Sequence, residues 1–65
     1  MKVKVRVGSK TYESESYRGV VGMALDDQGR RDTTIDQRLR ATDLLMRGRD
    51  ADIAGILIRF VEVTR

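Results

Sequence analysis

The sequence predicts a small α+β domain of order ββααβ: a β-hairpin, two helices and a C-terminal strand, with a three-stranded, mainly antiparallel sheet packed on the helices. Three observations predict this fold class. Residues 2–7 alternate cation and valine, and a period of two is typical of a half-buried strand. Residues 17–25 and 35–46 repeat apolar side chains at helical spacing. Residues 55–63 are dense in β-branched side chains, which favours a strand.

The opening hairpin is predicted together with its register. Gly8 is the first residue of a two-residue loop, where a type II′ turn needs the positive φ that glycine adopts at low cost. Apolar contact on one face and opposite charges on the other both favour this pairing, and the acidic residues neutralise part of the cationic stripe. The expected cross-strand pairs are Val5–Tyr12, Val3–Ser14, Lys4–Glu13 and Lys2–Glu15.

A first helix is predicted from residue 17 onward. Ser14 or Ser16 can cap its start, and Gly29 can end it in the left-handed conformation. Gly19 and Gly22 lie inside it, and we expect that they let another element pack closely. The apolar face of this helix consists of Tyr17, Val20, Val21, Ala24 and Leu25.

A second helix follows a charged connector over residues 26–32. We expect Asp32 or Thr33 to cap it, and Gly48 to stop it after about Arg47.

The second helix carries three sets of side chains on a helical wheel. The main apolar stripe is Ile35, Leu39, Thr42 and Met46. A charged stripe, typical of a solvated and self-compensating face, is formed by Asp36, Arg40, Asp43 and Arg47. Ala41, Leu44 and Leu45 lie outside the main stripe. The helix is therefore expected to be covered from more than one direction, either by the first helix or by a second subunit.

The last segment, residues 53–63, fits two structures. A strand from about residue 55 is favoured by Gly55 and by β-branched density, and it would lie beside residues 3–7. A helix stays open as the alternative, because helical spacing relates Ile53, Ile56, Leu57, Phe60 and Val61.

Composition limits the classes of function. The 65 residues form one domain, and so short a chain buries only about 60% of its unfolded surface, so we expect a homodimer or another protein partner. Without Cys and His, the chain has no disulfide, no thiolate metal site and no imidazole base. No apolar run approaches the ~18 residues of a membrane span and no signal-peptide pattern is present, so a cytoplasmic protein is expected.

The sequence predicts a protein that is not an enzyme and that needs no cofactor or small-molecule substrate. Its close carboxylate pairs are Asp26 with Asp27 and Asp50 with Asp52. Catalysis, or a Mg²⁺ or Ca²⁺ site, would need further ligands from elsewhere in the chain. For Asp50 and Asp52 we expect a structural role between two elements.

Nucleic-acid binding, to DNA rather than RNA, is the alternative function. Affinity for phosphates requires cations without acidic partners, and the candidates are Arg6, Lys10, Arg18, Arg30 and Arg31. The alternating strand at residues 2–7, with residues 29–45, resembles the ribbon-helix-helix repressors, whose paired strands insert into the major groove of DNA. That family has one strand per subunit, whereas this chain has a hairpin and a further strand, so no residue role is transferred.

The preferred function is a small non-catalytic regulatory, adaptor or inhibitor protein that acts through protein contacts, as a homodimer. A bias toward Arg, extra apolar faces on the second helix and a hydrophobic last strand at a sheet edge all favour association. The alternative is that the same residues form a self-contained core. The predicted interface residues are Ala41, Leu44, Leu45, Ile56, Ile58 and Phe60.

Overall fold

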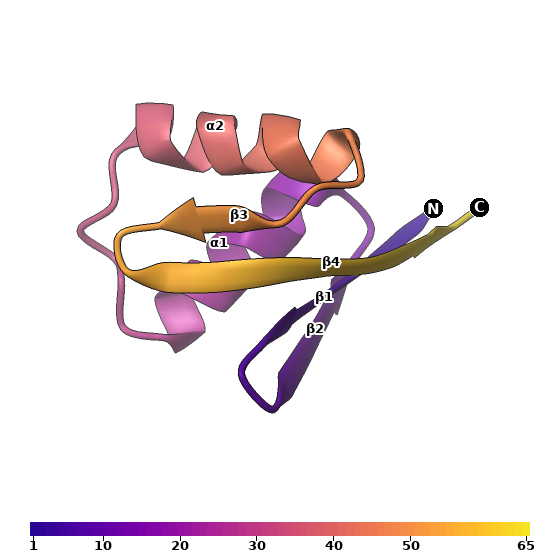
Figure 1. Cartoon of the computed structure of the whole chain (residues 1–65), viewed down its shortest axis with the longest axis horizontal. Helices are drawn as coiled ribbons and strands as arrows, with labels where there is room; N and C mark the ends of the chain where they lie inside the picture. The colour runs from indigo at the N-terminus through magenta and orange to yellow at the C-terminus, as the bar shows by residue number, and fades with distance from the viewer.

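The structure, a computed structural model, describes residues 1–65. Its elements are β1 (Lys2–Val7), β2 (Lys10–Ser14), α1 (Tyr17–Asp27), α2 (Ile35–Met46), β3 (Ala51–Ile53) and β4 (Ile56–Thr64). The strands form one antiparallel sheet in the order β2-β1-β4-β3, and the helices make the second layer (Figure 1). Alternate strand residues join α1 and α2 in a single core, and the residues between them face the opposite, open side of the sheet.

The predicted α+β class is confirmed, but the predicted three-stranded sheet is wrong by one strand. Residues 51–53 form β3, which pairs with β4 across a turn at Ala54 and Gly55, so the order is ββααββ. Three residues are too few for a period of two to be visible in the sequence. The strand alternative for the last segment is correct from Ile56 onward. The last strand is not at an edge, because β4 lies between β1 and β3.

The first hairpin has the predicted register. Val5 is opposite Tyr12 and Lys4 is opposite Glu13, and Gly8 has the expected positive φ of +60°. The predicted Lys2–Glu15 pair does not form, because β2 ends at Ser14. The Lys2 ammonium instead lies 3.8 Å from a carboxylate oxygen of Glu13.

The first helix begins and ends at residues that the sequence singled out. The Ser16 hydroxyl accepts a hydrogen bond from the Gly19 N–H at 2.9 Å, and Gly29 follows the helix at φ +76°. The expected close approach is found at Gly19, whereas at Gly22 a Cβ would make only an ordinary van der Waals contact. A Cβ on Gly19 would lie 2.5 Å from the Ser14 hydroxyl, and one on Gly22 would lie 3.5 Å from the Arg38 guanidinium of α2.

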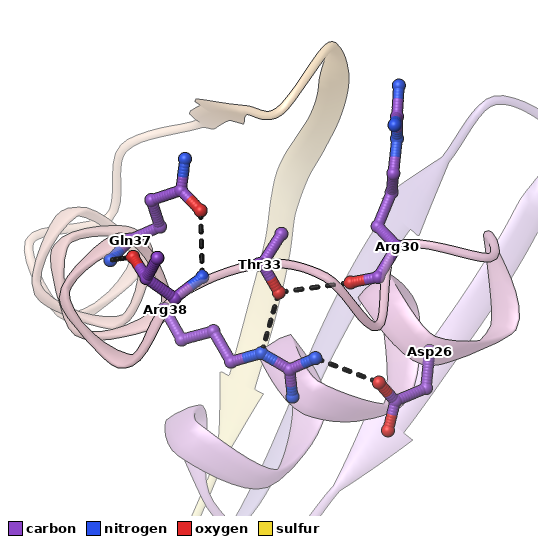
Figure 2. Close-up of polar contacts among 6 residues, drawn as sticks. Asp26, Arg30, Thr33, Gln37 and Arg38 are labelled. Carbon is purple, nitrogen blue, oxygen red and sulfur yellow. Dashed lines mark hydrogen bonds and ion pairs between the residues drawn. The ribbon is translucent and has the colours of Figure 1, made fainter.

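The second helix is capped one or two residues later than predicted, by Thr34. Thr34 and Gln37 form a capping box, in which each side chain accepts a hydrogen bond from the backbone N–H of the other residue, at 3.1 and 2.8 Å. Only Thr34 has a Gln or Glu three residues later, whereas the Thr33 hydroxyl binds the Arg30 carbonyl and Arg38 (Figure 2).

The two apolar faces of α2 are reversed relative to the prediction. The expected main stripe points outward: Ile35, Leu39 and Met46 are 68%, 44% and 62% exposed, and only Thr42 is buried. Ala41 and Leu45 face the core instead. Since alanine adds only a methyl group, α2 can approach the sheet closely at Ala41 while Leu45 fills the space beside it.

In the turn between β3 and β4, the backbone of Ala54 is strained. Ala54 has φ +52° and is followed by Gly55 at φ +79°, so both turn residues are left-handed, as in a type I′ turn. An L-residue with a Cβ pays roughly 1–2 kcal/mol for this conformation, and asparagine tolerates it best. Ala54→Asn should therefore raise the free energy of unfolding by about 0.5–1 kcal/mol in urea titrations. Ala54→Ser is the control and should give no comparable gain; equal effects of the two would contradict a strained turn.

Candidate functional site

The predicted interface residues belong to the core of a single chain or border it. Ala41, Leu45 and Ile58 are buried within the monomer. Leu44, Ile56 and Phe60 are half-buried and pack against the same core. The core of the single chain therefore takes up Ala41, Leu45 and Ile58, which leaves these three no surface for a partner, while Leu44, Ile56 and Phe60 keep part of theirs.

The exposed apolar surface lies on the other side of α2. We call Ile35, Leu39 and Met46 the α2 stripe. Beside the stripe, a hollow of about 230 Å³ is lined by Arg18, Gly22, Ile35, Arg38 and Leu39, from both helices. Met23 of α1 is also exposed, at 46%. The helical layer thus offers apolar surface that no element of the chain covers.

Arg38 fixes the α2 stripe relative to α1. Its guanidinium donates to Asp26 at 2.9 Å and to the Thr33 hydroxyl at 2.8 Å, so one side chain joins the last turn of α1, the connector and the first turn of α2 (Figure 2). Arg38 is only 26% exposed, so this charge-assisted contact is partly shielded from water. These contacts of Arg38 therefore fix the first turn of α2, and with it the α2 stripe, against the end of α1.

A second polar cluster joins the first hairpin to the end of α1. The Asp27 carboxylate accepts hydrogen bonds from the Tyr12 hydroxyl and, at 2.9 Å, from the Lys10 ammonium, while Gln28 donates to the Tyr12 oxygen at 2.9 Å. These bonds, from Tyr12 first and Lys10 second, lower the pKa of Asp27 below its ordinary value of 3.8. The same contact raises the pKa of Lys10. Lys10, a candidate phosphate ligand, therefore already has an acidic partner.

The other candidate cations make no ion pair, but they do not all lie on one surface. Arg18 lines the hollow between the helices, and Arg31 is exposed in the connector. Arg30 lies against the β3–β4 turn, with its guanidinium 3.6 Å from the position of a Cβ on Gly55. Arg6 faces the open side of the sheet. A continuous basic surface of the predicted residues is thus not formed.

The arrangement of β1 excludes the strand pairing of the ribbon-helix-helix repressors. β1 is hydrogen-bonded to β2 on one side and to β4 on the other. No edge of β1 is left to pair with a second subunit.

The open face of the sheet divides into a neutralised end and a cationic end. At the neutralised end, the Lys4 ammonium lies 3.3 Å from a carboxylate oxygen of Glu13 and 3.5 Å from one of Glu62. The hydrogen bond to Glu13 is the largest of the effects that raise the pKa of Lys4. At the cationic end, Arg6 is directly opposite Arg59 in the register of β1 and β4.

Next to these two arginines lies a hollow of about 420 Å³, between the two hairpin turns. We call it the sheet notch; its lining residues are Arg6, Val7, Gly8, Gly55, Ile56, Leu57 and Arg59. Arg59 is not among the cations predicted from the sequence. Its position between Ile58 and Phe60 predicts that its side chain points to the polar face of a strand. The sequence does not tell which residue of a neighbouring strand lies opposite it.

The close carboxylate pairs have structural contacts. Asp26 binds Arg38, Asp27 binds Tyr12 and Lys10, and Asp50 accepts the Phe60 N–H at 2.9 Å. The last contact agrees with the structural role expected of Asp50, whereas Asp52 lies inside β3 with an exposed side chain and not between two elements. No three His, Cys, Asp or Glu side chains come together in a group that can hold a metal ion. Neither helix has the length and apolar character needed to cross a membrane.

No protein-family model matches the chain, and neither a curated protein nor a solved structure matches it.

The Asp27 cluster predicts a specific response to acid. Because its pKa is lower in the folded chain than its ordinary value of 3.8, Asp27 contributes stability that is present above about pH 4 and is lost as the pH falls through the lowered pKa. Asp27→Asn should lower the free energy of unfolding at pH 7 and reduce its decline between about pH 4 and pH 2. Urea titrations across this range measure both effects. Asp32→Asn, at an exposed carboxyl without an ion pair, is the control and should leave the decline unchanged.

Proposed function

We propose that this chain is a small non-catalytic binding protein that acts through protein contacts, with the α2 stripe as its recognition surface. The observation that carries the proposal is the exposure of Ile35 and Met46 at 68% and 62%, on a helix whose other apolar face is already satisfied by the core. A line of large apolar side chains in water is typical of an association site. Such a protein regulates, links or inhibits other proteins by occupying a surface on them.

A second copy of the chain is the partner that fits this surface best. The charged stripe directly beside the apolar one has the order acid, base, acid, base along α2: Asp36, Arg40, Asp43 and Arg47. If two α2 helices pack antiparallel about residue 41, Asp36 meets the partner's Arg47, and Arg40 meets the partner's Asp43. In the same arrangement Ile35, at one end of the exposed stripe, lies near the partner's Met46 at the other end.

Two of these four charged residues have no ion-pair partner within the chain, which also favours a second copy as the partner. Asp43 and Arg47 form an exposed ion pair at 3.3 Å, whereas Asp36 and Arg40 have none. A two-fold contact would supply both with partners and would bury the stripe between the helices. Self-association also adds the buried area that a chain of 65 residues needs most.

The apolar part of this proposal is tested by Leu39→Asp. A charge in the middle of the stripe should weaken self-association at least ~tenfold, since it must be desolvated in the interface. Leu57→Asp is a matched control, because Leu57 is 40% exposed, close to the 44% of Leu39, but lies on the open face of the sheet. Sedimentation equilibrium over a concentration series measures both. A wild-type chain that stays monomeric at millimolar concentration, or equal effects of the two variants, would reject the surface.

The orientation is tested by exchanging charges. Arg40→Asp alone places two acids face to face in the antiparallel pair and should weaken the dimer about three- to tenfold. The double variant R40D/D43R restores opposite charges across the two-fold axis and should recover most of that loss. Helix content and urea stability, measured under monomeric conditions, control for effects inside α2. Failure of the double variant to recover affinity would rule out the antiparallel contact.

A further inference from the structure

Arg6 and Arg59 are held side by side without an acidic partner. Their Cα atoms are paired across β1 and β4, so both side chains leave the open face of the sheet at the same place. Neither makes an ion pair, whereas Lys2 and Lys4 on the same face contact Glu13. Like charges directly opposite each other destabilise a strand pair. The repulsion is relieved if an anion from outside the chain binds both guanidinium groups.

The sheet notch gives such an anion a place to bind. It is a hollow of about 420 Å³ between the turns at Gly8 and Gly55, and both arginines line it. Gly8 has no atom within 4 Å of the position of a Cβ, so the turn backbone is open to a ligand. Leu57 and Ile56 complete the wall as apolar surface.

A third guanidinium lies against the Gly55 turn at one end of the notch. Arg30 comes from the α1–α2 connector, and its terminal nitrogen is 3.6 Å from the Cβ position of Gly55, which is itself a lining residue. The Arg30 carbonyl takes part in the contact with Thr33, while its side chain extends away from the Asp26–Arg38 ion pair (Figure 2). Two arginines therefore line the hollow, and a third lies against the Gly55 turn at its end; none of the three is in an ion pair.

We propose that the sheet notch is a binding site for a phosphate group. Guanidinium groups bind phosphate oxygens through pairs of parallel N–H···O bonds, and two or three of them match the charge of a phosphate better than that of a carboxylate. The phosphate is carried either by a free ion or by the backbone of a nucleic acid, and the chemistry of recognition is the same. This site is separate from the α2 stripe, so each can fail without the other.

The first arm of the test uses inorganic phosphate and pyrophosphate as probes, with nuclear magnetic resonance of the ¹⁵N-labelled chain. Titration should shift the side-chain Nε–Hε resonances of Arg6, Arg30 and Arg59 and the amides of Gly8 and Gly55. Arg6→Gln and Arg59→Gln should each weaken phosphate binding at least ~fivefold. Arg65→Gln removes the same charge at the far end of β4 and should change it less than ~twofold. If one variant at the sheet does not fold, Arg30→Gln, in the connector, tests the same site.

The second arm separates the two sources with a short DNA duplex and a salt series. If nucleic acid carries the phosphate, Arg59→Gln should reduce the slope of log affinity against log salt by about 0.9, and Arg65→Gln should not. If the ligand is a free phosphate ion, the shifts with inorganic phosphate remain while DNA affinity is the same in both variants. Both results support a phosphate site. The proposal is overturned if neither probe shifts the notch resonances, or if Arg65→Gln weakens binding as much as Arg6→Gln.

Discussion

The pairing of β1 with β4 holds this fold together, because it joins residues near opposite ends of the chain. It runs from Lys2 opposite Thr64 to Arg6 opposite Arg59. A two-stranded hairpin is marginal in water, and without this pairing the chain would have two of them. The pairing combines them in a four-stranded sheet, one face of which the helices can cover. Val3, Val5 and Ile58 are completely buried along this junction, so the core depends on it as well.

One irregularity within that pairing arranges the charges on the open face. Lys4 is opposite Glu62 and Val5 is opposite Phe60, so Val61 is an extra residue in β4. Such a bulge resets the alternation of the strand. Phe60 therefore shares the helix side with Val5, while Glu62 reaches the open side and binds Lys4 at 3.5 Å. Beyond the bulge Arg6 is opposite Arg59, and neither of them makes an ion pair.

The features that the sequence predicts correctly depend on residues close together in the chain. The register of the first hairpin follows from Gly8 and from matched side chains a few residues away. The start of α1 at Ser16 and the glycine after its end are equally local. The cap of α2 was misplaced because three polar residues compete there, and a capping box at Thr34 and Gln37 decided between them. β3 was missed because three residues carry too little pattern.

The candidate sites depend on contacts between distant residues, and the sequence predicts little of them. Both apolar faces of α2 fit a helical wheel, and only packing against the sheet shows that Ala41 and Leu45 are inside while Ile35, Leu39 and Met46 are outside. Arg59 becomes a candidate only through its partner in β1. By itself the sequence determined the helices and the first hairpin, since caps, turns and periodicity act over a few residues. The tertiary structure alone decided which surfaces stay exposed, since burial is set by segments that meet only after folding.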